Sequence, residues 1–286
     1  MNPSEKLRAH HEKLIGTINS LVDRARKTPS DVSLLLSYCR QYLVPHAEGE
    51  EVTLYAACHD TEFVKKMVDE HKELKGHLDT VGEAFSRGEM QAVNPGIDSF
   101  MDLLNKHFQD EENVLMPRLS EKLSQQELES IIERAHNIEK EKKTSDVRAL
   151  FEYDHKRIDL NISALKNEKG ETAKILYSKM RRQLLKHIEL EEVVLVPAFT
   201  EVSSPNQTGP VQVMIAEHRE ITSRISIPAD QLDMTALRDD LQKLVGLLAV
   251  HNKKEEIILY PLINRTLDLK KREEVYGESL KKFMEV

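Results

Sequence analysis

The sequence predicts an all-α protein built from two tandem up-and-down antiparallel four-helix bundles, each followed by a short extra helix. Three observations support this fold class. The 286 residues include only 10 Gly, 10 Pro and no Trp, and so few turn-formers and aromatic residues favour long helices over a many-stranded sheet. Apolar residues recur at helical spacing. The second half of the chain also repeats the residue pattern of the first half.

Helical periodicity is clearest in three stretches, where apolar and ligand-type residues recur every three or four positions. The first is Leu7, Leu14, Ile15, Ile18, Leu21 and Val22; the second is Phe100, Leu103, Leu104, His107, Phe108, Glu111, Val114 and Leu115; the third is Leu244, Leu247, Leu248, His251, Glu255 and Ile258.

Helix-breaking residues separate such stretches at 28–31, 88–96, 167–170 and 203–210. The breaks predict four long helices in each half, with a shorter fifth at about 124–139 and 269–284. Short connections between long helices favour antiparallel neighbours. Pro45 lies inside the second helix and is expected to kink it just before His46.

The internal repeat places equivalent histidines about 144 positions apart. His11 and His155 differ by 144 positions, as do His107 and His251. The charged, apolar-free segment 139–145 lies between the halves. We therefore expect two domains, at residues 1–140 and 145–286.

The strongest motif is a His followed four and five positions later by Glu and eight positions later by Leu. It occurs four times, at His46-Glu50-Glu51-Leu54, His107-Glu111-Glu112-Leu115, His187-Glu191-Glu192-Leu195 and His251-Glu255-Glu256-Leu259. Residues four apart lie one above the other on a helix, so the His and the first Glu can bind one metal or two adjacent metals. The second Glu is expected to be a solvated charge.

Each half also carries two histidines on apolar helix faces without a following Glu. Four His and two Glu per bundle would be costly to bury without a metal. The set suits iron, manganese or zinc, and two metals bridged by both carboxylates, each with two His, is the simplest arrangement. The predicted ligands are His11, His46, Glu50, His71, His107 and Glu111 in the first bundle, and His155, His187, Glu191, His218, His251 and Glu255 in the second.

The same residues allow other interpretations. A single HxxxEE motif is more often a salt-bridged helix face than a metal site. A ferritin-like di-iron bundle needs ExxH motifs on two helices. Glu152-His155 and Glu133-His136 have that spacing, but neither recurs in the other half. The remaining histidines are expected to be surface or structural residues: His10, His59, His77 and His136.

The order His, HxxxE, His, HxxxE resembles the hemerythrin-like (HHE cation-binding) domain, here present twice. The resemblance implies a non-haem di-iron centre in each bundle, with two irons each, His ligands and two bridging Glu. Lys75 and Thr222 replace the fifth His that the oxygen-carrying hemerythrins place four residues after the third-helix His. This set looks more like the bacterial iron-sulfur cluster repair di-iron proteins and related sensory domains.

The function expected from this resemblance is binding, sensing or storage of oxygen, nitric oxide or iron. An enzyme that reduces nitric oxide or peroxide, or supplies iron for cluster repair, uses the same ligands, and a metal-free helical scaffold for an unknown protein partner is a third hypothesis. The net charge of −8 gives no reason to expect nucleic acid. The longest apolar run, 244–250, is too short for a membrane helix, and two unpaired cysteines suit a reducing, cytoplasmic location.

Overall fold

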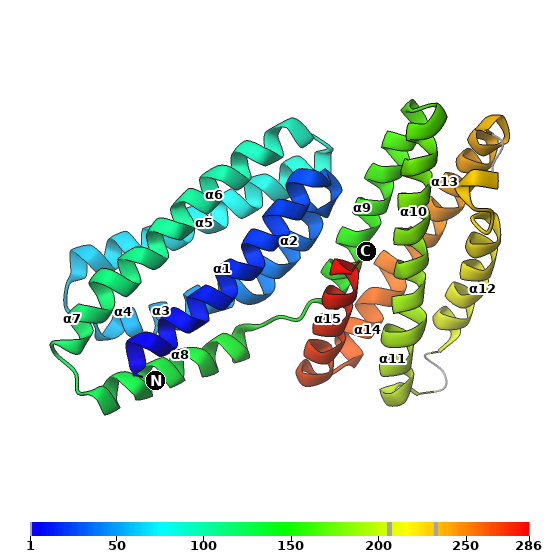
Figure 1. The fold of residues 1–286 in the computed structure, drawn as a ribbon. Coiled ribbons are helices and arrows are strands. Elements are labelled where there is room, and N and C mark those ends of the chain that lie inside the picture. Colours follow the sequence, from blue (N-terminus) through cyan, green and yellow to red (C-terminus); the bar gives the residue numbers. More distant parts are fainter. Residues whose placement is uncertain (1, 205–207, 232–233, 286) are drawn as a thin grey trace. The chain divides into compact units, whose positions relative to one another are not determined.

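The computed structural model describes residues 2–204, 208–231 and 234–285, and for 234–240 it describes only the backbone. The described residues form helices and connecting turns, with no strand among them. They divide into two compact units, Met1–Thr144 and Ser145–Val286 (Figure 1). The all-α fold with two helical bundles is confirmed. Of the predicted break at 203–210, residues 205–207 lie outside the described part.

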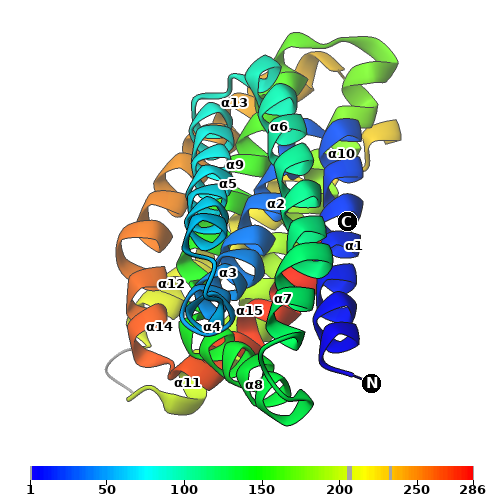
Figure 2. The ribbon, with the colours of Figure 1, turned by 90° about the vertical axis from the view of Figure 1, so that its left-hand side faces the viewer.

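The first unit contains four long helical rods and a fifth helix, and the rods run side by side (Figure 2). The second and fourth rods are composed of several shorter segments. In chain order the elements are α1 (Pro3–Lys27), η1 (Pro29–Asp31), α2 (Val32–Tyr38), η2 (Cys39–Leu43), α3 (Val44–Glu51), α4 (Leu54–Ala57), α5 (Thr61–Arg87), α6 (Met90–Asp110), η3 (Glu111–Leu115), α7 (Met116–Ser120) and α8 (Gln125–Lys142).

The second unit repeats this order. Its elements are α9 (Val147–Asn167), α10 (Gly170–Leu190), η4 (Glu191–Leu195), α11 (Val196–Val202), α12 (Gly209–Arg224), η6 (Ala229–Gln231), α13 (Met234–Lys254), η7 (Glu255–Leu259), α14 (Tyr260–Thr266) and α15 (Leu269–Met284). The extra helices α8 and α15 begin within two residues of the positions predicted from the sequence.

Local sequence signals explain where several helices begin and end. Asn2 and Ser124 each form a capping box with the Glu three residues later, and Asp60 caps α5 by accepting from the Phe63 backbone N–H. Gly88 ends α5 in the left-handed conformation, with φ of 74°. These caps fix the starts of α1, α5 and α8 and the end of α5.

Four rods contain one π-helical turn, and each such turn is followed by a proline. The turns are η2, η3, η4 and η7, and the prolines are Pro45, Pro117, Pro197 and Pro261. Proline has no N–H and its ring clashes with the carbonyl four residues earlier, so the helix widens there. At η3, η4 and η7 the widened turn begins at the first Glu of the HxxxEE motif.

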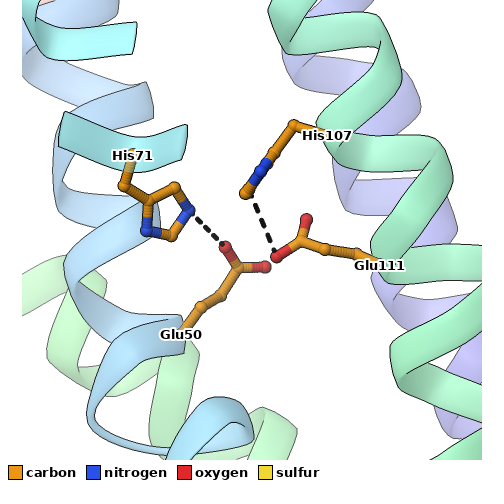
Figure 3. A group of neighbouring side chains, drawn as sticks. All are labelled: Glu50, His71, His107 and Glu111. Atoms are coloured by element: carbon orange, nitrogen blue, oxygen red, sulfur yellow. Dashed lines mark ion pairs between the residues drawn. The ribbon is translucent and has the colours of Figure 1, made fainter. Parts of the chain in front are cut away.

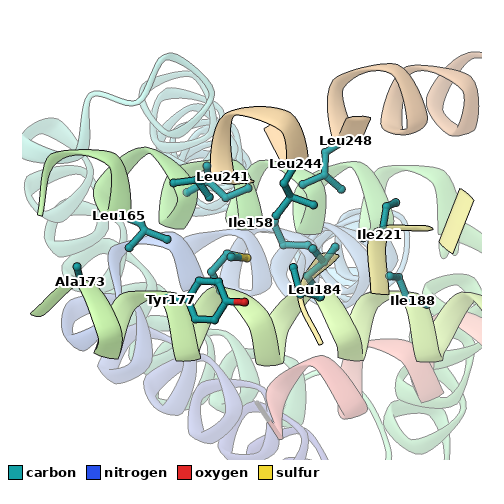
Figure 4. Close-up of a cluster of buried hydrophobic side chains, with 13 residues drawn as sticks. Ile158, Leu165, Ala173, Tyr177, Leu184, Ile188, Ile221, Leu241, Leu244 and Leu248 are labelled. Carbon is teal, nitrogen blue, oxygen red and sulfur yellow. The ribbon is translucent and has the colours of Figure 1, made fainter. Parts of the chain in front are cut away.

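Apolar layers fill the interior of each bundle. In the second unit, Ile158, Leu184, Ile221 and Leu244 from four rods meet in one buried cluster (Figure 4). In the first unit a buried cluster at a different level of the bundle includes Leu7, Leu54, Met67, Leu115 and Leu128. These layers fix the rotation of each rod, and therefore which side chains face the bundle axis.

Candidate metal centre

Six predicted ligands converge inside the first unit. His11 comes from α1, His46 and Glu50 from α3, His71 from α5, His107 from α6 and Glu111 from η3. All six are buried, with exposed fractions between 0% and 8%. Figure 3 shows the carboxylates of Glu50 and Glu111 facing one another, Glu50 beside His71 and Glu111 beside His107.

The two carboxylates each face imidazoles on both sides of the site. Oε1 of Glu50 lies 3.2 Å from Nε2 of His46 and 3.5 Å from Nε2 of His11, while its Oε2 lies 3.8 Å from Nε2 of His71. Oε2 of Glu111 lies 3.5 Å from Nε2 of His11, and its Oε1 lies 3.5 Å from Nε2 of His107. Each carboxylate therefore faces imidazoles from more than one rod.

The second unit brings its six predicted ligands together in the same way. Oε2 of Glu255 lies 3.2 Å from Nε2 of His155, and its Oε1 lies 3.1 Å from Nε2 of His251 and 3.6 Å from that of His218. Oε2 of Glu191 lies 3.4 Å from Nε2 of His187 and 3.1 Å from Nε2 of His218. All six are buried, each at most 3% exposed.

Several of the inward-facing atoms are buried without a hydrogen-bond partner. They include Nε2 of His11, His46 and His218, both oxygens of Glu50, Oε2 of Glu111 and Glu191, and Oε1 of Glu255. Such orphaned polar atoms are costly in a protein interior unless a cation or another polar group compensates them. Two groups in each unit place His nitrogens and Glu oxygens within 4.8 Å of one another. The residues therefore fit a pair of metal ions in each unit.

The pKa shifts of the metal-free site also indicate that it can accommodate cations. Burial lowers the pKa of His46, but the Glu50 and Glu139 carboxylates outweigh it and raise that pKa to about 10. Burial raises the pKa of Glu50, but His46 and His11 hold it well below its ordinary value. The site thus prefers positive charge beside its carboxylates, which protons supply when no metal does.

Residues 2–119 and 146–263 both match the hemerythrin HHE cation binding domain. The chain belongs to this family. No curated protein and no solved structure matches the chain. The family match and the geometry decide against a ferritin-like arrangement, since Glu152 pairs with Arg148 on the surface of α9. The resemblance to two tandem hemerythrin-like domains is confirmed, and each hemerythrin domain contains a His/Glu cluster that can hold cations.

The second Glu of each HxxxEE motif does not behave as predicted. Instead of a solvated charge, each of these carboxylates hydrogen-bonds the outward nitrogen of a histidine on another rod. Nδ1 of the histidine lies 2.8–3.1 Å from the carboxylate in the pairs His11–Glu112, His71–Glu51, His155–Glu256 and His218–Glu192. A residue that follows an inward-facing one is turned by about 100°, which places it at the seam with the next rod, where these carboxylates stay partly exposed, from 20% at Glu112 to 38% at Glu192.

The other four histidines of the predicted ligand set have acidic partners as well. His107 faces Glu70, His187 faces Asp154 and His251 faces Glu217, each at 2.9–3.0 Å, and His46 faces Glu139 at 3.8 Å. A carboxylate on Nδ1 fixes the ring orientation and makes Nε2 a better ligand. Sequence reasoning missed these partners; the acidic residues directly before His71, His155 and His218 were their only local signal.

Each hemerythrin domain also contains a tyrosine that the sequence reasoning missed. The hydroxyl of Tyr55 donates to Oε1 of Glu111, and that of Tyr260 donates to Oε1 of Glu191, both at 2.6 Å. Tyr55 lies near His71 and His107, whereas Tyr260 lies near His155 and His187. Burial raises the pKa of both phenols well above the ordinary value, so both keep their proton.

The two tyrosines come from different rods. Tyr55 follows Glu50 by five residues in the second rod of the first domain, and Tyr260 follows Glu255 by five in the fourth rod of the second. In the fourth rod the π turn η7 lies between the two residues and places position +5 above Glu255. In the second rod the break between α3 and α4 has the same effect. A tyrosine five residues after a ligand Glu is the sequence signal.

A cavity reaches the His/Glu cluster of each domain, and the two cavities lie between different rods. In the first domain a cavity of about 210 Å³ is lined by His46, His71 and His107 together with apolar residues such as Leu74 and Phe108. In the second a cavity of about 270 Å³ between α12 and the fourth rod is lined by Glu255 and apolar residues such as Met214 and Leu259. Mostly apolar walls suit small neutral molecules.

The four histidines outside the predicted ligand set divide into two groups. His59 is exposed, and His77 lies 3.7 Å from the exposed Glu73 on the same helix face. His10 and His136, by contrast, pack against each other where α8 meets α1. In the described ranges, none of the helices has the length and hydrophobicity required to cross a membrane.

Proposed function

We propose that each hemerythrin domain holds a non-haem di-iron centre that binds oxygen or nitric oxide, so that the protein senses or carries the ligand or stores iron. The observation that carries this proposal is the convergence of four imidazoles and two bridging carboxylates with buried unpartnered atoms in each domain. Mixed nitrogen and oxygen ligands suit iron, and thiolate-preferring metals are disfavoured.

In this assignment the ligands of the first domain form two pairs. His11 and His46 would hold one iron and His71 and His107 the other, with Glu50 and Glu111 shared between them, since their oxygens face imidazoles of both pairs. Four nitrogen and two shared carboxylate ligands leave coordination positions open for a small ligand. When bound, the irons supply redox chemistry and these open positions.

The surrounding residues prepare the site for a small neutral ligand. The acidic partners on Nδ1 hold the imidazoles in place, so that the ligand set is organised before a ligand enters. The cavity beside His71 and His107, whose walls are mostly apolar, is large enough to admit a diatomic molecule. Tyr55 keeps its proton, which it donates to Glu111 on the same side of the site.

The alternative function is an enzyme that reduces nitric oxide or peroxide, or that releases iron for cluster repair. The observation in its favour is the same phenol. A protonated hydroxyl within hydrogen-bond distance of the ligand atoms can supply a proton to a reduced product. Reversible spectral change on oxygen or nitric oxide addition and removal favours binding, and sustained consumption of nitric oxide or peroxide by the reduced protein favours catalysis.

The test is anaerobic iron loading followed by elemental analysis and absorption spectroscopy. The di-iron proposal predicts about four irons per chain and a spectrum that changes when oxygen or nitric oxide is admitted. Replacing Glu62, an exposed residue of α5, with Gln gives a surface control that should load normally. Loading with manganese or zinc in preference to iron, or no loading at all, would overturn the proposal.

A further inference from the structure

The seam between α1 and α8 contains a second kind of cation cluster, apart from the two centres above. His10 from α1 and His136 and Glu139 from α8 place one ligand atom each within 4.8 Å of one another. The family match ends at residue 119, before α8 begins. Two of the three residues of the cluster therefore lie on the extra helix, outside the region that matches the family, and His10 lies on the first rod.

The three side chains of this cluster lie close enough together to bind one metal ion. Nε2 of His10 lies 3.1 Å from Oε2 of Glu139, yet both atoms are buried without a hydrogen-bond partner. The rings of His10 and His136 are edge to face, with centroids 4.7 Å apart. Tetrahedral zinc with bonds of about 2.0–2.1 Å needs ligand atoms roughly 3.3 Å apart, which small side-chain movements provide here.

The extra helix α8 packs tightly against the bundle near this cluster, but His10 remains partly accessible to solvent. A Cβ at Gly49 of α3 would lie 2.6 Å from the backbone oxygen of Ala135, so only glycine lets α8 approach this closely. The side chain of His10 is 19% exposed, which gives a cation a way in. The other oxygen of Glu139, Oε1, lies 3.3 Å from Nζ of Lys143, which leaves Oε2 facing the two histidines.

In the second domain the equivalent seam contains a cationic side chain, that of Arg157. Asp154 precedes His155 as His10 precedes His11, and it pairs at 3.0 Å with Nε of Arg157, which is fully buried beside the Phe283 ring of α15. In the first domain the position of Arg157 is taken by the exposed Lys13. Leu280 and Phe283 stand at the positions of His136 and Glu139.

We propose that His10, His136 and Glu139 form a mononuclear binding site for a divalent transition-metal cation of the zinc type, a third metal site in the first domain. Two imidazoles and one carboxylate are a ligand set that zinc uses, with water in the fourth position. Glu139 also faces His46 at 3.8 Å, so this site adjoins the di-metal centre through one carboxylate.

The test uses the full chain after iron loading. Wild-type protein is dialysed against micromolar zinc, and zinc and iron are counted together in wild type and in His136→Gln. We expect one more zinc per chain in wild type than in His136→Gln, with equal iron in the two. His77→Gln, which removes a histidine of α5 outside any cluster, is the matched control and should bind as much zinc as wild type.

A zinc count that is equal in wild type and His136→Gln would overturn the proposal, provided that both melt cooperatively by circular dichroism. If His136→Gln fails to fold, Glu139→Gln in its place should show the same loss of one zinc. The test is a difference between variants, so it also works on protein that takes up no iron. Failure of the di-iron proposal and failure of the seam site therefore give different results.

Discussion

The hydroxyl of Tyr55 lies 2.6 Å from Oε1 of Glu111, at the centre of the first hemerythrin domain. The tyrosine comes from the second rod and the carboxylate from the fourth, the two rods that carry HxxxE motifs. The bond uses one carboxylate oxygen and leaves Oε2 of Glu111 without a hydrogen-bond partner. Tyr55 thus fixes the orientation in which Glu111 faces both histidine pairs.

Replacing Tyr55 with Phe removes this hydroxyl and keeps the ring in its apolar cluster. Because the bond is to a buried carboxylate, the metal-free protein should lose about 1.5–3 kcal/mol of unfolding free energy. Urea denaturation followed by circular dichroism measures the loss. Tyr260→Phe is the matched variant of the second domain and should cost a similar amount. No destabilisation in either variant would show that these hydroxyls do not hold the carboxylates.

Replacing Glu112 with Gln weakens the carboxylate support of His11 while leaving every proposed ligand in place. Glu112 lies 3.1 Å from Nδ1 of His11, and loss of such a partner costs about 10–100-fold in metal affinity. Competition with a chelator of known affinity measures the change. Glu12→Gln, an exposed change on the same helix as His11, is the control. If Glu112→Gln and Glu12→Gln bound metal with equal affinity, Glu112 would be a solvated charge that does not support His11.

Gly49→Ala should loosen α8 from the first bundle. The added Cβ would lie 2.6 Å from a backbone oxygen of α8, and such overpacking costs about 1–3 kcal/mol. Gly76→Ala on α5 meets nothing within 4 Å and should stabilise by about 0.5–1 kcal/mol. Thermal melts of the two variants should therefore shift in opposite directions. If Gly49→Ala left the melting temperature unchanged, α8 would not be held at this contact.

The stability of the metal-free protein should fall as the pH rises above about 6.5. Although burial alone lowers the pKa of the buried histidines, neighbouring carboxylates raise it to about 10 in His46, His107, His155 and His218. The protonated histidines stabilise the fold fully below their unfolded pKa of about 6.5, and this contribution is lost as the pH rises towards 10. Melting temperatures from pH 6 to 10 test this; a flat or rising profile would contradict it.

At low pH the dependence is opposite: the stability of the metal-free protein should fall as the pH decreases. The pKa of Glu50 and of Glu255 lies well below the ordinary value, since burial is outweighed by the surrounding histidines. Their contribution is present above about pH 4.5 and is lost as the pH falls. The metal-free protein should therefore be most stable between about pH 4.5 and 6.5. Bound metal replaces the histidine protons, so metal affinity should rise with pH over the range in which the metal-free form weakens.

The fold and the ligand geometry were predictable because both depend on short-range helical spacing. His46 and Glu50 are four residues apart, so any helix places them together, and the apolar residues on the same face direct them inward. The repeat then predicts the same arrangement for His187 and Glu191. Nothing beyond helix periodicity is needed to bring these side chains to the bundle axis.

The surrounding interactions could not be predicted because they depend on contacts between rods. Whether Glu112 points to solvent or to His11 depends on the rotation of two rods about their axes, which the spacing within one helix does not specify. The position of Tyr260 depends on the widened turn at Glu255, which shifts the register by one residue. Glu139 reaches His46 only because Gly49 lets α8 approach closely.

The central claim is that each hemerythrin domain holds its own pair of irons, and iron counting in Glu111→Ala tests it most directly. Glu111 is fully buried and faces both histidine pairs of the first domain, and no residue of the second cluster depends on it. Elemental analysis after anaerobic loading should give about four irons per chain in wild type and about two in the variant. An iron-free wild type, or a variant that loads as much iron as wild type or loses all of it, would contradict the account.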